Sequence, residues 1–360
     1  NVKGAAAALA RALPKAGIPQ PVARAGLRAA REGGRNEPDL VLALSRGAEL
    51  DQGEVSLTDA ELRQMVADVQ RKGDPARGEA VYRRKELSCV ACHAIGGAGG
   101  KVGPDLTSIG ASAPVDYLIE SVWFPNRKIK EGYHALMIET KDGQEFSGTL
   151  VRETGEQVIL RDATDKEIAI ARSNLQERRV STLSLMPAGL IDGLTPQERI
   201  DLFRFLSELG KPGPFDASKG NVARAWKLRP GLHVEDQKSD GSLPFRDLAG
   251  SEWIPAIANV DGRVPAALLR EGTVVQNRFV GVTGLYAAAQ LQTAREGTIK
   301  LSLSGATEGS LWIDGKPVAF AGKVSAELPA GLHTVVLRLD PKKLPEFLRL
   351  ESSDGTFVVP

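Results

Sequence analysis

Cysteine is nearly absent from this chain, which has only two cysteines in 360 residues. A disulfide-rich fold is therefore excluded. No run of about 18 uncharged apolar residues occurs, so the sequence predicts no transmembrane helix. The 46 basic and 45 acidic residues nearly cancel, and bulk charge therefore gives no sign of nucleic acid or an anionic membrane as a partner. A chain of this length is expected to form about two to four domains.

Both cysteines lie in one five-residue stretch, Cys89-Val90-Ala91-Cys92-His93. C-x-x-C-H is the attachment pattern of a c-type haem, in which two thiols bind the porphyrin and the histidine becomes an axial iron ligand. A disulfide would leave the histidine unexplained, a zinc site lacks a second Cys or His cluster, and a thioredoxin-like pair lacks its βαβ setting. The sequence therefore predicts one covalently attached haem c, held by Cys89, Cys92 and His93, with His93 binding the iron.

Covalent haem attachment requires reduced haem and thiols outside the cytoplasm, so the sequence predicts a periplasmic or secreted location. The chain begins at Asn1 without an initiator methionine or a signal peptide. We expect it to be a processed or excised part of a longer protein.

Residues 1–72 are rich in alanine and leucine at helical spacing, with breaks at residues 17–21 and 33–38. A further helix is expected from Thr58 to Val69. We interpret this segment as α-helical and repeat-like, resembling the end of a helical-repeat array with a packing role.

Three further helices are expected around the haem motif. Asp74 and Pro75 predict the start of the first, as N-cap and first-turn proline. The apolar face at residues 115–123 predicts a second, which would cover the haem edge. A capping box at residues 195–198 opens the third, which ends at Gly210.

These residues resemble a class I cytochrome c. In that family a glycine and an aromatic residue on the first helix pack against the last helix, which Gly78 and Tyr82 match. The resemblance implies that the Pro104 carbonyl accepts a hydrogen bond from Nδ1 of the ligand histidine. It also implies a second iron ligand from a methionine just before the last helix, which is Met186. The alternatives are His134 as the second ligand and a core role for Met186.

An insertion is inferred because roughly 90 residues separate Cys92 from Met186, whereas a small cytochrome c has about 100 in all. Between residues 128 and 181 the pattern changes to about five short strands, including 135–140, 145–151, 158–160 and 167–171, with a hairpin signal at Asp142-Gly143. We expect a small SH3-like β-barrel. The hairpins also resemble Sm-type RNA-binding barrels, but RNA is disfavoured because there is no aromatic stacking pair and no net basic charge.

Three features together resemble the haem-binding domain of planctomycete and verrucomicrobial c-type cytochromes. They are the C-x-x-C-H helix, Gly132-Tyr133 before a Thr-Lys-Asp-Gly hairpin, and Ser-Leu-Met-Pro-Ala-Gly-Leu at residues 184–190. The resemblance covers about residues 73–210. In that family the domain commonly ends large periplasmic or secreted proteins with helical repeats and a sugar-dehydrogenase-like propeller. It implies fusion of a haem to a dehydrogenase-like module, although this sequence shows no propeller.

Residues 211–360 show regularly spaced alternating segments that predict a β-sandwich. Strands are expected at 274–282, 285–291, 297–303, 310–313, 331–339 and 348–352. The segments around Trp312 and His333 resemble jelly-roll modules of the galactose-binding and protective-antigen type, many of which bind glycans. Packing is the alternative role for both side chains.

Four other residues of this region are expected to lie in turns or in a linker. Asp314 and Asp354, each followed by glycine, are expected to form turns, with calcium binding as the alternative. Trp226 and His233 are expected to lie in a linker without a recognisable role.

The predicted fold is therefore multidomain α+β. It comprises an α-helical segment (1–72), a class I cytochrome c domain (73–127 and 182–210), an inserted small β-barrel (128–181) and a β-sandwich (211–360). The predicted function is single-electron transfer by a monohaem c-type cytochrome, from a periplasmic sugar or alcohol dehydrogenase module to a downstream acceptor. The chain is expected to be an electron-transfer protein or a domain of a larger dehydrogenase rather than a self-contained enzyme. The alternatives are a glycan-binding or scaffolding protein with an accessory haem, and a haem sensor.

Overall fold

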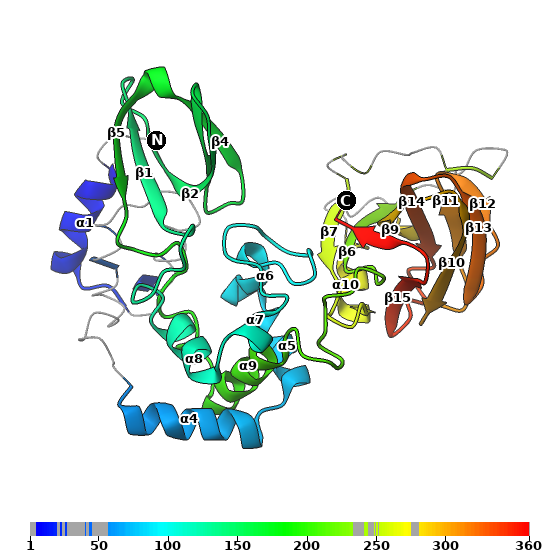
Figure 1. Ribbon diagram of the computed structural model, residues 1–360, viewed down its shortest axis with the longest axis horizontal. Helices are drawn as coiled ribbons and strands as arrows, with labels where there is room; N and C mark the ends of the chain where they lie inside the picture. Colours follow the sequence, from blue (N-terminus) through cyan, green and yellow to red (C-terminus); the bar gives the residue numbers. More distant parts are fainter. Residues whose placement is uncertain are drawn as a thin grey trace. The chain divides into compact units, whose positions relative to one another are not determined.

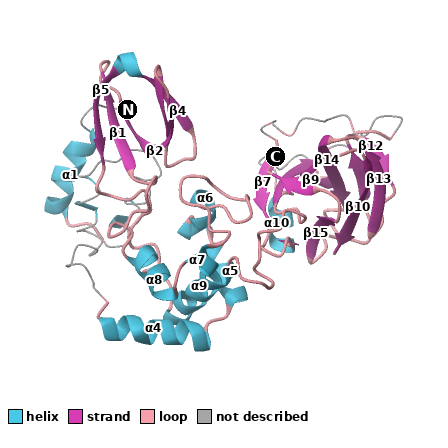
Figure 2. Ribbon diagram, viewed as in Figure 1, coloured by secondary structure: helices cyan, strands magenta, loops and turns pink. Residues whose placement is uncertain are grey.

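The computed structural model describes residues 5–19, 22, 23, 26, 40, 43, 44, 57–232, 241–243, 248, 250, 252–274 and 281–359. The chain forms two compact units (Figure 1). The first comprises Asn1–Ala94, Gly100–Pro104 and Gly110–Ser207, and the second comprises Ile95–Gly99, Asp105–Ile109 and Glu208–Pro360. The first unit contains most of the helices and one sheet, whereas the second is built mainly from strands (Figure 2). The prediction of a mixed α and β protein with a β-rich C-terminal region is confirmed.

Helices α1 (Ala5–Ala16) and α4 (Asp59–Lys72) lie at the two ends of the N-terminal region. Thr58 caps α4, because its hydroxyl accepts from the Glu61 N–H at 3.2 Å and the Glu61 carboxylate accepts from the Thr58 N–H at 2.8 Å. Ala10 of α1 belongs to a small buried cluster with Ala23, Leu40, Ala43 and Leu44. These helices agree with the helical prediction, while most residues that would test a repeat-like arrangement lie outside the described part of the chain.

The helices around the C-x-x-C-H motif are α5 (Pro75–Tyr82), η1 (Lys85–Leu87), α6 (Cys89–Cys92), α7 (Ile109–Ser112), α8 (Val115–Trp123) and α9 (Pro196–Glu208). Of these, α5, α8 and α9 begin at the predicted signals, whereas η1 and α7 were not expected from the sequence. The Asp74 carboxylate caps α5 by accepting from the N–H groups of Ala76 at 2.9 Å and Arg77 at 3.0 Å. Gly210, just beyond α9, has a φ of 80°, the left-handed conformation that ends many helices.

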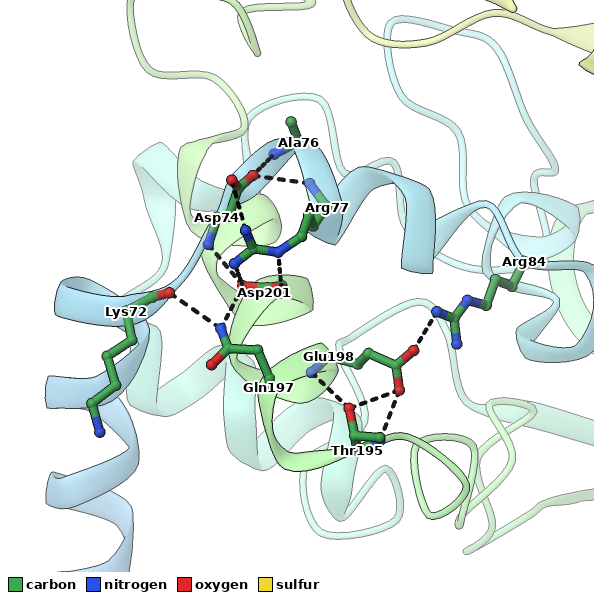
Figure 3. Close-up of polar contacts among 9 residues, drawn as sticks. All are labelled: Lys72, Asp74, Ala76, Arg77, Arg84, Thr195, Gln197, Glu198 and Asp201. Atoms are coloured by element: carbon green, nitrogen blue, oxygen red, sulfur yellow. Dashed lines mark hydrogen bonds and ion pairs between the residues drawn. The ribbon is translucent and has the colours of Figure 1, made fainter.

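The N-terminus of α9 is fixed by the predicted capping box. The Thr195 N–H donates to the Glu198 carboxylate at 2.8 Å, and the Glu198 N–H donates back to the Thr195 hydroxyl at 3.3 Å. Glu198 also pairs with Arg84 (Figure 3). The hydrogen bonds from Thr195, together with that from Arg84, lower the pKa of Glu198 to about 2. The carboxylate is therefore ionised at any neutral or mildly acidic pH, and it holds α9 to the segment that follows α5.

The inserted segment folds into one antiparallel sheet. Its strands are β1 (Ala135–Thr140), β2 (Glu145–Glu153), β3 (Gln157–Arg161), β4 (Glu167–Ala171) and β5 (Leu175–Val180), in the order β4-β3-β2-β1-β5. The apolar side chains that alternate along β1, β3 and β4 form its core: Leu136, Ile138, Val158, Leu160 and Ile170. Among the described residues no pairing of β4 with β5 closes the ladder. The structure therefore shows an open sheet of five strands where the sequence predicted a closed barrel.

The second unit contains two antiparallel sheets. One has the order β13-β10-β15-β8, and the other has the order β12-β11-β14-β9-β6-β7, with β16 also paired to β9. The elements are β6 (Ala225–Gly231), β7 (Ile254–Ile257), β8 (Val264–Pro265), α10 (Ala266–Glu271), β9 (Gly284–Thr293), β10 (Gly297–Ser304), β11 (Ser310–Ile313), β12 (Lys316–Val318), β13 (Lys323–Leu328), β14 (Gly331–Leu339), β15 (Phe347–Ser352) and β16 (Thr356–Val358).

Apolar residues from both sheets of the second unit belong to one buried cluster, including Leu301 and Leu350 from the first sheet and Ala289 and Leu337 from the second. Each sheet therefore buries one face in a common core. Trp226 lies in β6 and is part of this core, so its predicted place in a linker is wrong.

Two predictions for the second unit concern parts of its sequence that the structure does not describe. Most of the strand expected at 274–282, and His233, lie outside the described residues.

Within the described part of the chain, no helix combines the length and the apolar composition needed to cross a membrane.

Candidate functional site

The two cysteines lie at the ends of the single helical turn α6. Positions three apart on a helix share one face, so both side chains leave the turn on the same side. Both residues are half-buried, and neither forms a disulfide. The backbone enters this turn through Ser88, whose φ is 56°. The turn therefore presents two reduced thiols side by side, as attachment to one flat group requires.

The environment keeps these thiols protonated. Burial raises the pKa of Cys89 to about 12. Burial, and to a smaller extent the negative charge of Asp165, raises the pKa of Cys92. A redox-active pair of the thioredoxin type depends on a lowered thiol pKa, so the raised values disfavour that alternative.

His93 follows directly after α6, with its backbone extended and its N–H donating to the Cys89 carbonyl at 2.9 Å. Its ring Nδ1 lies 2.7 Å from the Pro104 carbonyl oxygen. Because a carbonyl can only accept, Nδ1 carries the proton, and Nε2 is the ring nitrogen that carries the lone pair. The Tyr82 hydroxyl donates to the His93 carbonyl at 3.2 Å. Both the ring and the backbone of His93 are thus fixed in orientation.

Two glycines allow the loop that carries Pro104 to approach the motif closely. A Cβ on Gly100 would lie 1.8 Å from the Ala91 carbonyl oxygen, and one on Gly103 would lie 2.4 Å from Cε1 of the His93 ring. The Gly103 N–H donates to the Cys92 carbonyl at 2.8 Å. Neither position has room for a side chain, so the glycines determine how closely the loop and the His93 ring pack.

Helices α5 and α9 cross in contact and support the motif. A Cβ on Gly78 would lie 1.9 Å from the Asp201 carbonyl oxygen, so the two backbones are too close for any side chain between them. Next to this crossing the rings of Tyr82 and Phe205 pack with their centroids 5.4 Å apart. The packing of Gly78 and Tyr82 on the last helix is the arrangement that the sequence resemblance implied.

The same crossing contains an ionic network around the buried carboxylate of Asp201 (Figure 3). Asp201 of α9 accepts from the Asp74 N–H at 2.8 Å, from Arg77 Nε at 2.7 Å and Nη2 at 3.0 Å, and from Gln197 Nε2 at 2.9 Å. Gln197 also donates to the Lys72 carbonyl at 3.2 Å. Burial alone would raise the pKa of Asp201, but the hydrogen bonds from Arg77, the Asp74 N–H and Gln197 together hold it below its usual value.

Helix α8 presents an apolar face with Leu118 and Ile119 buried. Trp123 at its end is half-buried, stacks on Phe124 with centroids 6.4 Å apart, and has the Arg199 guanidinium 5.2 Å from its ring centroid. The expected contact of this face with the haem edge stays a prediction.

Met186 lies in the loop between β5 and α9 and is half-buried. Its N–H donates to the Ser184 hydroxyl at 3.1 Å, and the Ser184 N–H donates to the Asn126 side chain at 2.9 Å, just after α8. This loop is therefore attached to the segment that follows α8. His134 is exposed, just before β1. Iron ligation by either residue stays a prediction.

Asp165 is a residue near the site that the sequence did not indicate. It lies on the turn between β3 and β4, and its carboxylate accepts from the Lys101 N–H at 3.1 Å, in the loop that leads to Pro104. No local pattern could have revealed this contact, because the two residues are 64 positions apart.

The residues considered for sugar or calcium in the second unit are engaged in packing and turns. Trp312 is buried, and its Nε1 donates to the Gly241 carbonyl at 2.9 Å. His333 is buried, and its Nδ1 lies 2.7 Å from the carboxylate of Asp314, which has a φ of 52° in its turn. Asp354 accepts from the Lys300 N–H at 3.2 Å. These positions favour the structural roles, and glycan binding stays a prediction.

Comparison with known proteins identifies no family. No family model and no curated protein matches the chain. Among solved structures, an anti-sigma factor domain-containing protein aligns with 11% sequence identity over 63% of this chain and 77% of that chain, with a TM-score of 0.22.

Proposed function

We propose that this chain is a monohaem c-type cytochrome that transfers single electrons. The observation that supports it best is the joint geometry of the motif: Cys89 and Cys92 on one face of a single turn, followed by a histidine whose Nδ1 faces the Pro104 carbonyl at 2.7 Å. A disulfide or a reactive dithiol would not require an oriented histidine. A covalently bound haem requires all three.

The residues present fit a haem. The thiols of Cys89 and Cys92 would form the two thioether bonds, and Nε2 of His93 would bind the iron, with Met186 as the proposed second ligand. The bound haem would supply one-electron chemistry between ferric and ferrous iron, at a potential that methionine ligation raises relative to ligation by two histidines. Pro104 would hold the proton on Nδ1 and so keep the His93 ring in its ligating orientation.

The assignment of the helices and sheets to domains is part of this proposal. The helices α5, α6, α8 and α9 would form a class I cytochrome c domain, and the contact of Gly78 of α5 with α9 supports this. The open sheet β1–β5 would be an insertion in this domain, since all five strands lie between α8 and α9 in the chain. The two sheets of the second unit, which share one core, would form a jelly-roll-like β-sandwich.

The partners follow from the same proposal. The protein would work in the periplasm or outside the cell, accept electrons from a sugar or alcohol dehydrogenase, separate or fused, and pass them to a downstream acceptor. Such redox contacts are small and transient. In this role the protein itself activates no substrate.

The test is the visible and near-infrared spectrum of the purified ferric protein, compared with those of Met186→Ala and Met137→Ala. Met137 is a half-buried methionine of β1 and serves as the matched control. We expect covalently attached haem, a near-infrared sulfur-to-iron band that only Met186→Ala abolishes, and no carbon monoxide binding by the reduced wild type.

Other outcomes would contradict parts of this assignment. Absence of covalent haem after expression with a haem-attachment system would contradict the whole proposal. An open wild-type site that readily binds carbon monoxide would indicate a sensor or catalyst instead of an electron carrier. A closed site that is unaffected by Met186→Ala but opened by His134→Ala would make His134 the second ligand.

A further inference from the structure

The turn between β3 and β4 has a tightly defined conformation. The Asp162 N–H donates to the Lys166 carbonyl at 2.9 Å, and the Asp165 N–H donates to the Asp162 carbonyl at 3.1 Å. The Asp162 carboxylate accepts from the Thr164 N–H at 2.8 Å. Asp165 has a φ of 64°, a conformation that few residues other than glycine adopt. The turn therefore holds the Asp165 carboxylate in a fixed place at the edge of the inserted sheet.

The Asp165 carboxylate connects the inserted sheet to the loop after the haem motif. Oδ2 accepts from the Lys101 N–H at 3.1 Å, while Oδ1 accepts from Arg161 Nη1 at 2.6 Å. The other terminal nitrogen of Arg161 donates to Glu167 at 2.6 Å. Only 15% of the Arg161 side chain is exposed, so this arginine fixes the Asp165 side chain from a mostly buried position.

The loop that Asp165 holds is the one that orients His93. Lys101 lies between Gly100 and Gly103, the two positions of closest approach to the motif, and Pro104 at the end of the loop faces His93 Nδ1. A displacement of Lys101 would therefore be passed on to the Pro104 carbonyl.

We propose that Asp165 is a positioning residue of the haem site, through which the inserted sheet holds the loop at residues 100–104 and lowers the reduction potential of the haem. This inference rests on the proposed cytochrome function. A fixed negative charge beside the site stabilises the ferric form, which carries one more positive charge than the ferrous form, and so makes reduction less favourable. The insertion is then part of the redox site as well as an appended module.

The test uses two variants, each of which neutralises one of the two carboxylates that pair with Arg161. Asp165→Asn keeps an oxygen acceptor for Lys101 but loses the charge near the motif, and Glu167→Gln loses a charge on the same arginine without contacting that loop. Spectroelectrochemical titration is expected to give a higher midpoint potential for Asp165→Asn than for wild type, with a smaller shift for Glu167→Gln. An equal shift in both variants, no shift or a downward shift in Asp165→Asn would overturn the electrostatic part of the proposal.

The positioning part has its own readout. Asp165→Ala removes the acceptor for the Lys101 N–H, and the loss of one such hydrogen bond is expected to accelerate hydrogen exchange at Lys101 about tenfold. Unchanged exchange at Lys101 would refute the positioning role. Both measurements differ from the test for covalent haem. If the wild-type protein loads haem but the Asp165 variants show neither effect, this inference is contradicted and the proposed function is left intact.

Discussion

The substitution Gly103→Ala tests directly how His93 is held. A Cβ at this position would lie 2.4, 2.7 and 2.8 Å from Cε1, Nδ1 and Nε2 of the His93 ring, whereas ordinary contact begins near 3.4 Å. The ring would have to move by about 1 Å, which would stretch its 2.7 Å contact with the Pro104 carbonyl beyond hydrogen-bond range. Overpacking costs about 1–3 kcal/mol and a lost hydrogen bond about 1 kcal/mol, so the free energy of unfolding should fall by about 2–4 kcal/mol.

The matched control is Gly155→Ala in the turn between β2 and β3, where an added Cβ meets no atom within 4 Å. Its unfolding free energy is expected to stay within about 1 kcal/mol of wild type. Urea unfolding followed by far-ultraviolet circular dichroism measures both variants. In the haem-loaded protein, only Gly103→Ala should change the ferric spectrum, because only there does the ligand ring move. Equal unfolding midpoints and identical spectra for the two variants would refute the packing of His93 on Gly103 as the feature that fixes the ring.

Three further outcomes are expected. Asp201→Ala should lower the unfolding free energy by about 2–4 kcal/mol, because it removes the acceptor of hydrogen bonds from the Asp74 N–H, Arg77 and Gln197. Since the folded-state pKa of Asp201 lies below its usual 3.8, the stabilisation is complete above about pH 4 and is lost as the pH falls through that lower value. In Asp201→Asn, the free energy of unfolding from urea denaturation should therefore fall less steeply with decreasing pH below about pH 4 than in wild type. In the second unit, His333→Leu should cost about 1–3 kcal/mol in calorimetry by breaking a buried hydrogen-bonded contact, whereas His134→Leu at an exposed position should cost almost nothing. In chain expressed without haem, Cys89 should react with iodoacetamide roughly tens of times more slowly at pH 8 than an ordinary thiol with a pKa of 9, because the higher nucleophilicity of its thiolate only partly offsets the smaller thiolate fraction, and denaturation should abolish the difference.

Much of the local structure could be predicted from the sequence. The expected bounds of α8, β1, β4, β11 and β14 agree with the structure, and the caps at Asp74 and Thr195 fix helix starts as expected. These features depend on side-chain periodicity and on hydrogen bonds between residues two to four apart in the chain. The candidate haem motif is local in the same sense, because all its residues lie within one turn and the next position.

Other features could not be predicted, because they depend on partners far away in the chain. β5, Leu-Gln-Glu-Arg-Arg-Val, has no apolar alternation, and its strand conformation follows from pairing with β1. Trp226 occurs in a stretch without a clear strand pattern, yet it is buried because β6 pairs with both β7 and β9. A one-dimensional pattern cannot show which edge of a sheet a strand will join.

The sequence by itself therefore determined which reactive groups this protein brings together, since a C-x-x-C-H turn places two thiols and an imidazole together without help from distant residues. The tertiary structure alone decided how those groups are held. It placed the Pro104 carbonyl on the His93 ring, packed Gly78 against α9, and brought Asp165 of the inserted sheet to the Lys101 N–H. Each of these contacts depends on backbone approach or on a charge held at a fixed distance, and both are set by the folded packing of segments that are separate in the chain.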